Sequence, residues 1–145
     1  MQEENIMNFI NSYFESNEYF FITIINHQNN KTTNYHHNIH SFQRNLSKIL
    51  YANNQSSIYF TINSFKDEEN SFLNEYKYPS KVKGNVSKVK ALVFDFDDPT
   101  TSKLNVANLI KTFNIKPTYI LQTSPKKFQI CFMLNDSVDS LNWEK

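Results

Sequence analysis

Hydrophobic positions along the chain fall into two patterns, one typical of helices and one typical of strands. Apolar residues that recur every three or four positions predict amphipathic helices at residues 3–16, 40–52 and 102–113. Continuous apolar runs rich in β-branched and aromatic residues predict strands at 19–26, 57–63, 89–96, 118–122 and 128–134. The polar stretches 27–38 and 64–86 predict loops, the second with one short helix, and a last helix is expected to begin near Ser137.

The order of these elements predicts an α+β fold in which helices are layered on a mixed sheet. Residues 89–134 form a strand, helix, strand, strand unit that is similar to part of a ferredoxin-like or RNA-recognition-type domain. No internal repeat and no Pro/Gly-rich linker interrupts the sequence. We therefore expect a single domain over residues 1–145.

The overall composition limits the classes of protein that fit. Hydrophobic residues make up 39% of the 145 residues, enough for a packed core and too many for a disordered tail. Lys and Arg number 15 against 14 Asp and Glu, so the net charge gives no indication of a nucleic-acid partner. No apolar stretch reaches the length of about eighteen residues that a membrane span needs, and we expect a cytoplasmic location. The lone Cys131 lies in an apolar run and is expected to be a buried thiol.

Acidic residues end the predicted strand 89–96. Side chains two apart in a strand point to the same face, so Asp95 and Asp97 are expected to project side by side. Adjacent carboxylates repel each other unless a cation lies between them, and carboxylate oxygens are ligands that Mg²⁺ and Mn²⁺ prefer. We interpret Asp95 and Asp97 as a metal-binding pair of the kind used in nucleotidyl transfer. The alternative is that the acids end the strand and cap the next helix, which we favour for Asp98.

A basic turn joins the last two predicted strands. Ser124, Lys126 and Lys127 lie in this turn and could hold phosphates, with lysine as a point charge and serine as a donor. Gln129 interrupts an otherwise apolar strand and could hydrogen-bond a nucleotide. An ordinary solvated turn and a solvent-facing glutamine fit the same pattern. On adjacent strands, the acids and the basic turn could face one cleft, as a nucleoside-triphosphate site requires.

These motifs together resemble the archaeo-eukaryotic primase superfamily, in its plasmid- and phage-type replication branch. The run ALVFDFDD resembles the family strand that ends in Asp-x-Asp, and TYILQTSPKKFQICFML resembles the Ser-Pro-x-x-Phe-Gln form of the motif that follows. Upstream, IYFTINSFK resembles the family strand that carries an asparagine, here Asn63. The resemblance covers roughly residues 55–135 and rests on three short motifs in the right order.

The resemblance implies a primase-polymerase nucleotidyltransferase core that acts in DNA replication, for example of a plasmid, a phage or an integrated element. Asp95 and Asp97 would be the catalytic pair, with Mg²⁺ or Mn²⁺ as the cofactor. The residues implied to contact the nucleotide are Ser124, Gln129, Lys126, Lys127 and Asn63. The implied partners are a single-stranded DNA template, nucleoside triphosphates and a helicase domain or protein.

Two features depart from the family pattern. Many members have His at the position of Gln129. The family also needs a third carboxylate on a later strand, and Asp136 and Asp139 lie instead in a helix-capping context. We interpret the chain as the N-terminal part of a truncated catalytic core, which would be weak or inactive alone.

Two other functions stay open. A haloacid-dehalogenase-like phosphatase also has an Asp-x-Asp strand, but Pro99 and Thr100 disturb the register that this family needs after its second acid. The missing third carboxylate instead favours a degenerate, non-catalytic nucleic-acid-binding or interaction module.

Three further clusters have a structural and a functional interpretation. Four histidines lie in and after a polar loop, and we favour a loop without metal over a metal-binding pair. They are His27, His36, His37 and His40. A run of lysines could contact a nucleic-acid backbone or belong to a solvated loop; they are Lys77, Lys81, Lys83, Lys88 and Lys90. Aromatic residues near these lysines could stack on bases; they are Tyr59, Phe60, Tyr76 and Tyr78. For Phe60, which lies in a predicted strand, we favour core packing.

Overall fold

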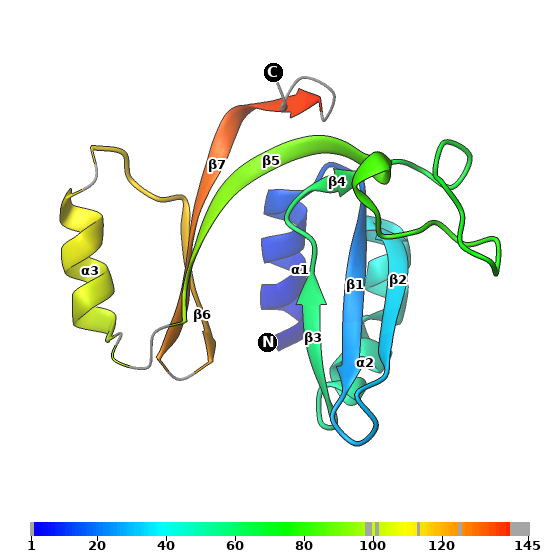
Figure 1. The fold of residues 1–145 in the computed structure, drawn as a ribbon, viewed down its shortest axis with the longest axis horizontal. Helices are drawn as coiled ribbons and strands as arrows, with labels where there is room; N and C mark the ends of the chain where they lie inside the picture. Colours follow the sequence, from blue (N-terminus) through cyan, green and yellow to red (C-terminus); the bar gives the residue numbers. More distant parts are fainter. Residues whose placement is uncertain (1, 98–99, 101, 113, 125, 140–145) are drawn as a thin grey trace. The chain divides into compact units, whose positions relative to one another are not determined.

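The computed structural model describes residues 2–97, 100, 102–112, 114–124 and 126–139. The helices in this part of the chain are α1 (Gln2–Tyr13), α2 (Ile39–Ala52), the 3-10 helix η1 (Lys83–Asn85) and α3 (Lys103–Thr112). The strands are β1 (Tyr19–Asn26), β2 (Thr32–Asn38), β3 (Ser56–Phe60), β4 (Ser64–Phe65), β5 (Val86–Phe96), β6 (Tyr119–Ser124) and β7 (Lys127–Asp139). The fold is α+β, as predicted (Figure 1).

The chain forms two compact units, and each is described by itself. The first comprises Met1–Val89 and Val138–Lys145, and the second comprises Lys90–Ser137. In the first unit β1 pairs antiparallel with β2, β3 and β4, and β4 pairs with the beginning of β5. In the second unit β7 has β5 and β6 as its neighbours. The two units differ in that each makes most of its contacts within itself, which does not decide whether they form one domain. The single domain over residues 1–145 therefore stays a prediction.

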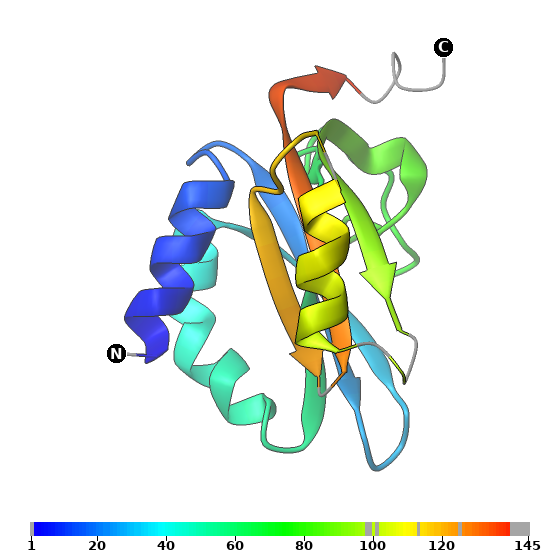
Figure 2. The same ribbon diagram turned by 90° about the vertical axis from the view of Figure 1, so that its left-hand side faces the viewer.

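Aromatic side chains form the core of the first unit between β1 and two helices. Figure 2 shows α1 and α2 side by side on one face of the strands. On that face Phe20 stacks on Phe14, which directly follows α1, with ring centroids 4.4 Å apart, and meets Phe42 of α2 edge-on. Because strand side chains alternate, Phe21 points to the other face, where it packs on Phe65. Both faces of β1 therefore pack against apolar side chains, which explains why apolar and polar residues do not alternate in the run 19–26.

Helix α2 begins with a capping box. The Asn38 side chain accepts a hydrogen bond from the Ser41 backbone N–H at 2.9 Å, and the Ser41 hydroxyl accepts one from the Asn38 N–H at 3.1 Å. The buried residues of the helix recur at helical spacing and are Ile39, Phe42, Leu46 and Ile49. The predicted helix 40–52 is therefore confirmed.

Polar strands overturn two of the predictions. Residues 32–38, inside the predicted loop 27–38, form β2, whose backbone pairs with β1 from Tyr19–Asn38 to Ile25–Thr32. Most of its side chains lie at least partly in solvent, so this strand needs no apolar alternation. Residues 137–139 continue β7 instead of starting a helix near Ser137, because β7 has β5 as a second strand partner beside β6. The rest of that predicted helix lies outside the described residues.

Smaller differences concern the ends of elements. Strand β3 ends at Phe60, before the predicted end at residue 63, and β5 begins at Val86, before the predicted start at residue 89. Strand β4 and the 3-10 helix η1 lie within the predicted loop 64–86, which was expected to hold one short helix.

A long loop, residues 66–85, connects β4 to β5 in the first unit (Figure 1). Fully buried Asn85 lies at its base. The Asn85 side-chain oxygen accepts a hydrogen bond from the Phe72 N–H at 2.6 Å, and its nitrogen donates to the carbonyls of Phe72 and Ser80, each at 2.8 Å. The Asn85 carbonyl also accepts from the Lys66 N–H at 2.8 Å. One asparagine thus holds both arms of the loop together.

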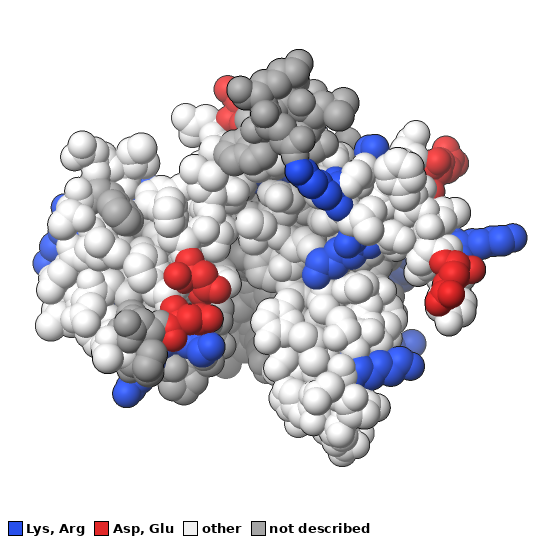
Figure 3. Space-filling view, in the orientation of Figure 1, with Lys and Arg blue, Asp and Glu red and all other residues white. Residues whose placement is uncertain are grey.

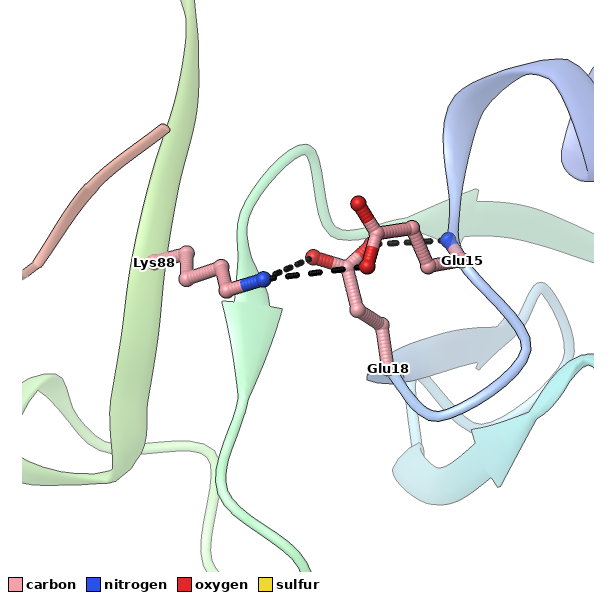
Figure 4. A network of polar contacts seen from close by, with 3 residues as sticks. All are labelled: Glu15, Glu18 and Lys88. Carbon is pink, nitrogen blue, oxygen red and sulfur yellow. Dashed lines mark hydrogen bonds and ion pairs between the residues drawn. The ribbon is translucent and has the colours of Figure 1, made fainter. Parts of the chain in front are cut away.

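An ion pair joins the start of β5 to the segment between α1 and β1 (Figure 4). The Lys88 ammonium lies 3.5 Å from Glu18 and 3.9 Å from Glu15. The Glu18 side chain is only 5% exposed, and it also accepts the Glu15 backbone N–H at 2.9 Å. A carboxylate removed from water needs partners of this kind, because its desolvation is costly.

The core of the second unit lies between α3 and the β6–β7 hairpin. Its buried residues are Val106, Phe128 and Ile130, and the residues packed against them are Phe96, Ile110 and Phe132. Strand β6 pairs antiparallel with β7 from Tyr119–Cys131 to Ser124–Lys127. Cys131 is buried, as expected. The strand, helix, hairpin order confirms the predicted β-α-β-β unit.

Replacing Lys88 by methionine is expected to lower the free energy of unfolding by about 1–3 kcal/mol, because Glu18 stays buried without this cation. Urea unfolding followed by circular dichroism measures the change. Glu15→Gln is the control: it removes a partner whose side chain is 68% exposed, and a change below about 0.5 kcal/mol is expected. Unaltered stability of Lys88→Met would show that the ion pair contributes nothing.

Replacing Asn85 by alanine is expected to destabilise the first unit by about 2–4 kcal/mol, because backbone groups at the loop base lose their partners. The loop then opens to proteases, and limited proteolysis at its lysines should become faster. Asn70→Ala changes an exposed asparagine of the same loop and should leave the cleavage rate near that of the parent. Equal cleavage of the two variants would contradict a clamping role for Asn85.

Candidate functional site

Strand β5 brings Asp95 and Asp97 to the surface of the second unit. Asp95 is exposed, and the Asp97 side chain is 59% exposed. The Lys127 ammonium, at the start of β7, lies 3.4 Å from an Asp97 oxygen. In the space-filling view, acidic side chains gather over the end of β5 with a basic side chain beside them (Figure 3). The negative charge of this surface is therefore partly balanced by a lysine from the neighbouring strand.

The alternation of side chains determines which face of the sheet carries the acids. Phe96 packs on the α3 core, and Phe94 meets Phe132 edge-on with ring centroids 5.9 Å apart. Even-numbered residues of β5 and β7 therefore share the face covered by α3. Asp95 and Gln129 are odd-numbered, so both lie on the opposite face. We expected the acids and the basic turn to face one cleft, and that expectation stays a prediction.

The hairpin turn presents lysines at the end of the same strands. Ser124 pairs with Lys127 across the hairpin, and Lys126 lies in the turn between β6 and β7. Lys126 adopts a left-handed backbone conformation with φ 65°, and both lysines are exposed. The Ser124 side chain lies outside the part of the chain whose side chains are described. Gln129 is half-buried.

The other predicted site residues lie elsewhere in the chain. Asn63 lies in the first unit, half-buried between β3 and β4, and its predicted contact with nucleotide stays a prediction. Asp98 lies outside the described residues. Asp136 is exposed on β7, in a strand and not in the capping context expected for it.

Within the ranges that the structure describes, no group of three or more His, Cys, Asp and Glu side chains is arranged to hold a metal ion. Asp95 and Asp97 supply oxygen donors of the type that Mg²⁺ and Mn²⁺ prefer, and their exposure leaves room for water and phosphate oxygens as further ligands. The pair therefore fits one side of such a site.

The histidines are placed separately, each with its own neighbours. His36 in β2 stacks on Tyr19 and its Nε2 lies 3.0 Å from the Lys66 carbonyl, which fixes the proton of the neutral ring on that nitrogen. His37 Nδ1 lies 3.1 Å from the Ser41 hydroxyl. Burial lowers the pKa of both rings, and for His37 the neighbouring His36 lowers it further.

The lysines of the predicted strip have different roles. Lys88 is held by Glu18, Lys90 is buried, and Lys81 donates to the Thr23 hydroxyl at 2.8 Å. The exposed lysines of this set are those on the loop 66–85, namely Lys77, Lys81 and Lys83. Among the aromatics, Phe60 packs on Phe9 and Tyr13 as predicted, whereas Tyr59, Tyr76 and Tyr78 are exposed.

A polar pocket in the first unit was not predicted. Its volume is about 470 Å³, and its lining includes Glu18, Lys88, Tyr19, Phe65, Lys66 and Asp67. The Glu18–Lys88 pair that forms one wall joins residues far apart in the sequence, and no local pattern could have indicated it. The predicted site residues are absent from the lining of this pocket.

Comparison with known proteins supports the fold. No protein-family model and no curated protein matches the sequence. The fold is an α+β fold similar to that of a solved primase domain. That structure is the catalytic domain of the primase RepB', crystallised in complex with initiator DNA, with a TM-score of 0.55 and 15% sequence identity. The match covers 91% of this chain and 58% of that one, so the chain spans little more than half of the solved domain.

Each helix in the described part of the chain is too short or too polar to cross a membrane.

Stability is expected to fall as the pH drops below about 6.5, through His36 and His37. Their pKa values are lowered in the folded chain, so the unfolded chain takes up protons first and acid favours unfolding. Thermal unfolding between pH 7.5 and 5 measures the slope. His36→Phe/His37→Phe should show a smaller loss of melting temperature over this range. An identical slope in parent and variant would contradict the assignment.

Proposed function

We propose that the chain is a primase-type nucleotidyl-transfer core that acts in DNA replication, with Asp95 and Asp97 at its metal site. The single observation that supports this most is the shared face of Asp95 and Gln129, with Lys127 against Asp97, on a fold similar to a primase catalytic domain. Carboxylates for a metal beside cations for phosphates are the composition that a nucleoside-triphosphate site requires.

Asp95 and Asp97 would hold Mg²⁺ or Mn²⁺ through their exposed oxygens. A divalent ion bound there would make the attacking 3′-hydroxyl more acidic and stabilise the leaving pyrophosphate. Through such an ion, the two carboxylates would position the triphosphate on the face of the sheet opposite the apolar core beneath α3. The proposed partners are a single-stranded DNA template and nucleoside triphosphates.

Lys127 would change partner during binding. In the free protein its ammonium offsets the charge of Asp97 at 3.4 Å. When a cation and a triphosphate are bound, the same ammonium can turn to a phosphate oxygen, and Lys126 at the turn offers a second cation. Gln129, on the face of Asp95, would hydrogen-bond the nucleotide, and Ser124 and Asn63 are proposed as further contacts.

A second candidate function has an observation of its own. Because two carboxylates and no third metal-ligating side chain are grouped in the described residues, a nucleic-acid-binding module without catalysis also fits. A helicase partner and a plasmid or phage origin remain part of the primase proposal. Metal-dependent nucleotide binding separates the two functions, since a non-catalytic module has no need of it.

Titration calorimetry with Mn²⁺ and a nucleoside triphosphate is expected to detect binding that Asp95→Asn/Asp97→Asn weakens at least about tenfold, because the metal loses both carboxylate ligands. The parent should also lose binding when Mn²⁺ is removed with a chelator. Binding is measured in place of turnover because it does not depend on further catalytic residues.

The control for this experiment is Glu68→Gln/Glu69→Gln, which removes two exposed carboxylates from the loop of the first unit. It changes the net charge equally and should leave binding unaltered. If the parent fails to bind the triphosphate, or binds it without metal or without the two aspartates, the proposed site is wrong.

A further inference from the structure

The tip of the loop 66–85 exposes an unusual group of large side chains. Tyr76 and Tyr78 are 72% and 68% exposed, and Phe72 and Leu73 beside them are also exposed. Exposed aromatic groups clustered on one loop are more often binding surfaces than packing defects, because burying them elsewhere would stabilise the fold.

The backbone of this tip is ordered by hydrogen bonds and presents the two tyrosines in a fixed way. The Asn74 side-chain oxygen accepts the backbone N–H groups of both Tyr76 and Tyr78, at 2.9 and 3.0 Å. The Asn74 N–H donates to the Tyr78 carbonyl at 2.8 Å, and Leu73 and Pro79 form a bridge below the turn. With Asn85 clamping the base, the tyrosines are held at the end of a short, braced hairpin.

Lysines lie near both tyrosines in the sequence of the loop. Lys77 lies between them in a left-handed conformation with φ 61°, and Lys81 and Lys83 follow on the returning arm. Residues 72–83 carry these three lysines against one acidic residue, Glu75, so the tip is basic although the whole chain is nearly neutral. The acidic residues of the loop lie instead near its start, at positions 67–69.

The chemistry of the tip fits single-stranded nucleic acid better than a protein partner. Aromatic rings interleaved with lysines provide stacking surfaces for bases and point charges for phosphates at the spacing of a flexible strand. We propose that residues 72–83 bind single-stranded nucleic acid, with Tyr76 and Tyr78 stacking on bases and Lys77 contacting phosphate. This surface is made of residues other than Asp95 and Asp97 and does not depend on their binding metal.

The test is fluorescence anisotropy of a labelled oligothymidylate titrated with the full chain in the presence of a chelator. Tyr76→Ala/Tyr78→Ala is expected to weaken binding about tenfold or more, because two stacking rings are lost. Tyr76→Phe/Tyr78→Phe keeps the rings and should retain most of the affinity. Both changes concern exposed side chains, and circular dichroism verifies that each variant is folded.

Two controls separate this surface from others. Tyr51→Ala removes an equally exposed tyrosine from α2, with 79% exposure, and should leave binding unchanged. The chelator keeps the assay independent of any metal at Asp95 and Asp97, so failure of the metal site and failure of this surface are distinguishable.

The role of Lys77 is tested by Lys77→Gly. Glycine accepts the left-handed φ, so the turn is kept and only the cation is lost. The dependence of the binding constant on salt should then fall by about one phosphate contact.

The proposal is overturned if the alanine double variant binds like the parent or no worse than Tyr51→Ala. It is also overturned if the parent does not bind the oligonucleotide. In that case self-association or protein binding that is lost in Tyr76→Ala/Tyr78→Ala would identify the tip as a protein-docking surface.

Discussion

The two-residue period of β5 is the constraint on which the candidate site depends. Phe96 packs under α3 with Val106 and Phe128, and this contact fixes the orientation of the strand. Asp95, one residue earlier, must then point the opposite way. The apolar core and the acidic surface are therefore made by one strand, and a shift of register by one residue would bury the carboxylate and expose the ring. The same rule places Gln129 of β7 opposite Phe128.

Local patterns in the sequence predicted those parts of the structure that local physics determines. The helices α2 and α3 follow from apolar spacing, and the place of Asp95 near the end of an apolar strand follows from the run 89–96. Strand β2 was missed because its polar residues, among them His36 and His37, form a strand only through backbone pairing with β1. The end of β7 was missed for a similar reason, since Ser137 is a turn former that a strand partner overrides.

Contacts between residues distant in sequence could not be predicted in this way. Nothing near Glu18 indicates Lys88 as its partner, and nothing near Asn85 indicates that it holds Phe72 and Ser80. Both contacts are polar, and each joins residues that no periodic pattern in the sequence connects. The lysines of the predicted strip illustrate the same limit of sequence analysis. One of them is buried, one is ion-paired and the others are exposed, and only the fold distinguishes these cases. The similarity of fold at 15% identity is consistent with this limit, because many different sequences can form the same packing pattern. The chemistry of a protein depends on its site residues and not on its fold alone.

The left-handed turns connect stability with recognition. The chain contains one glycine, and its left-handed residues within the described ranges are Asn30, Lys77 and Lys126. A lysine in this conformation costs on the order of 1 kcal/mol relative to glycine. Lys77 and Lys126 are also the cations that the two proposed binding surfaces carry at their turns. Evolution toward a more heat-resistant protein would find glycine favourable at both positions, and would lose the cations that we propose contact phosphate. If the proposals hold, thermostability and ligand affinity are opposed at the same two backbone positions.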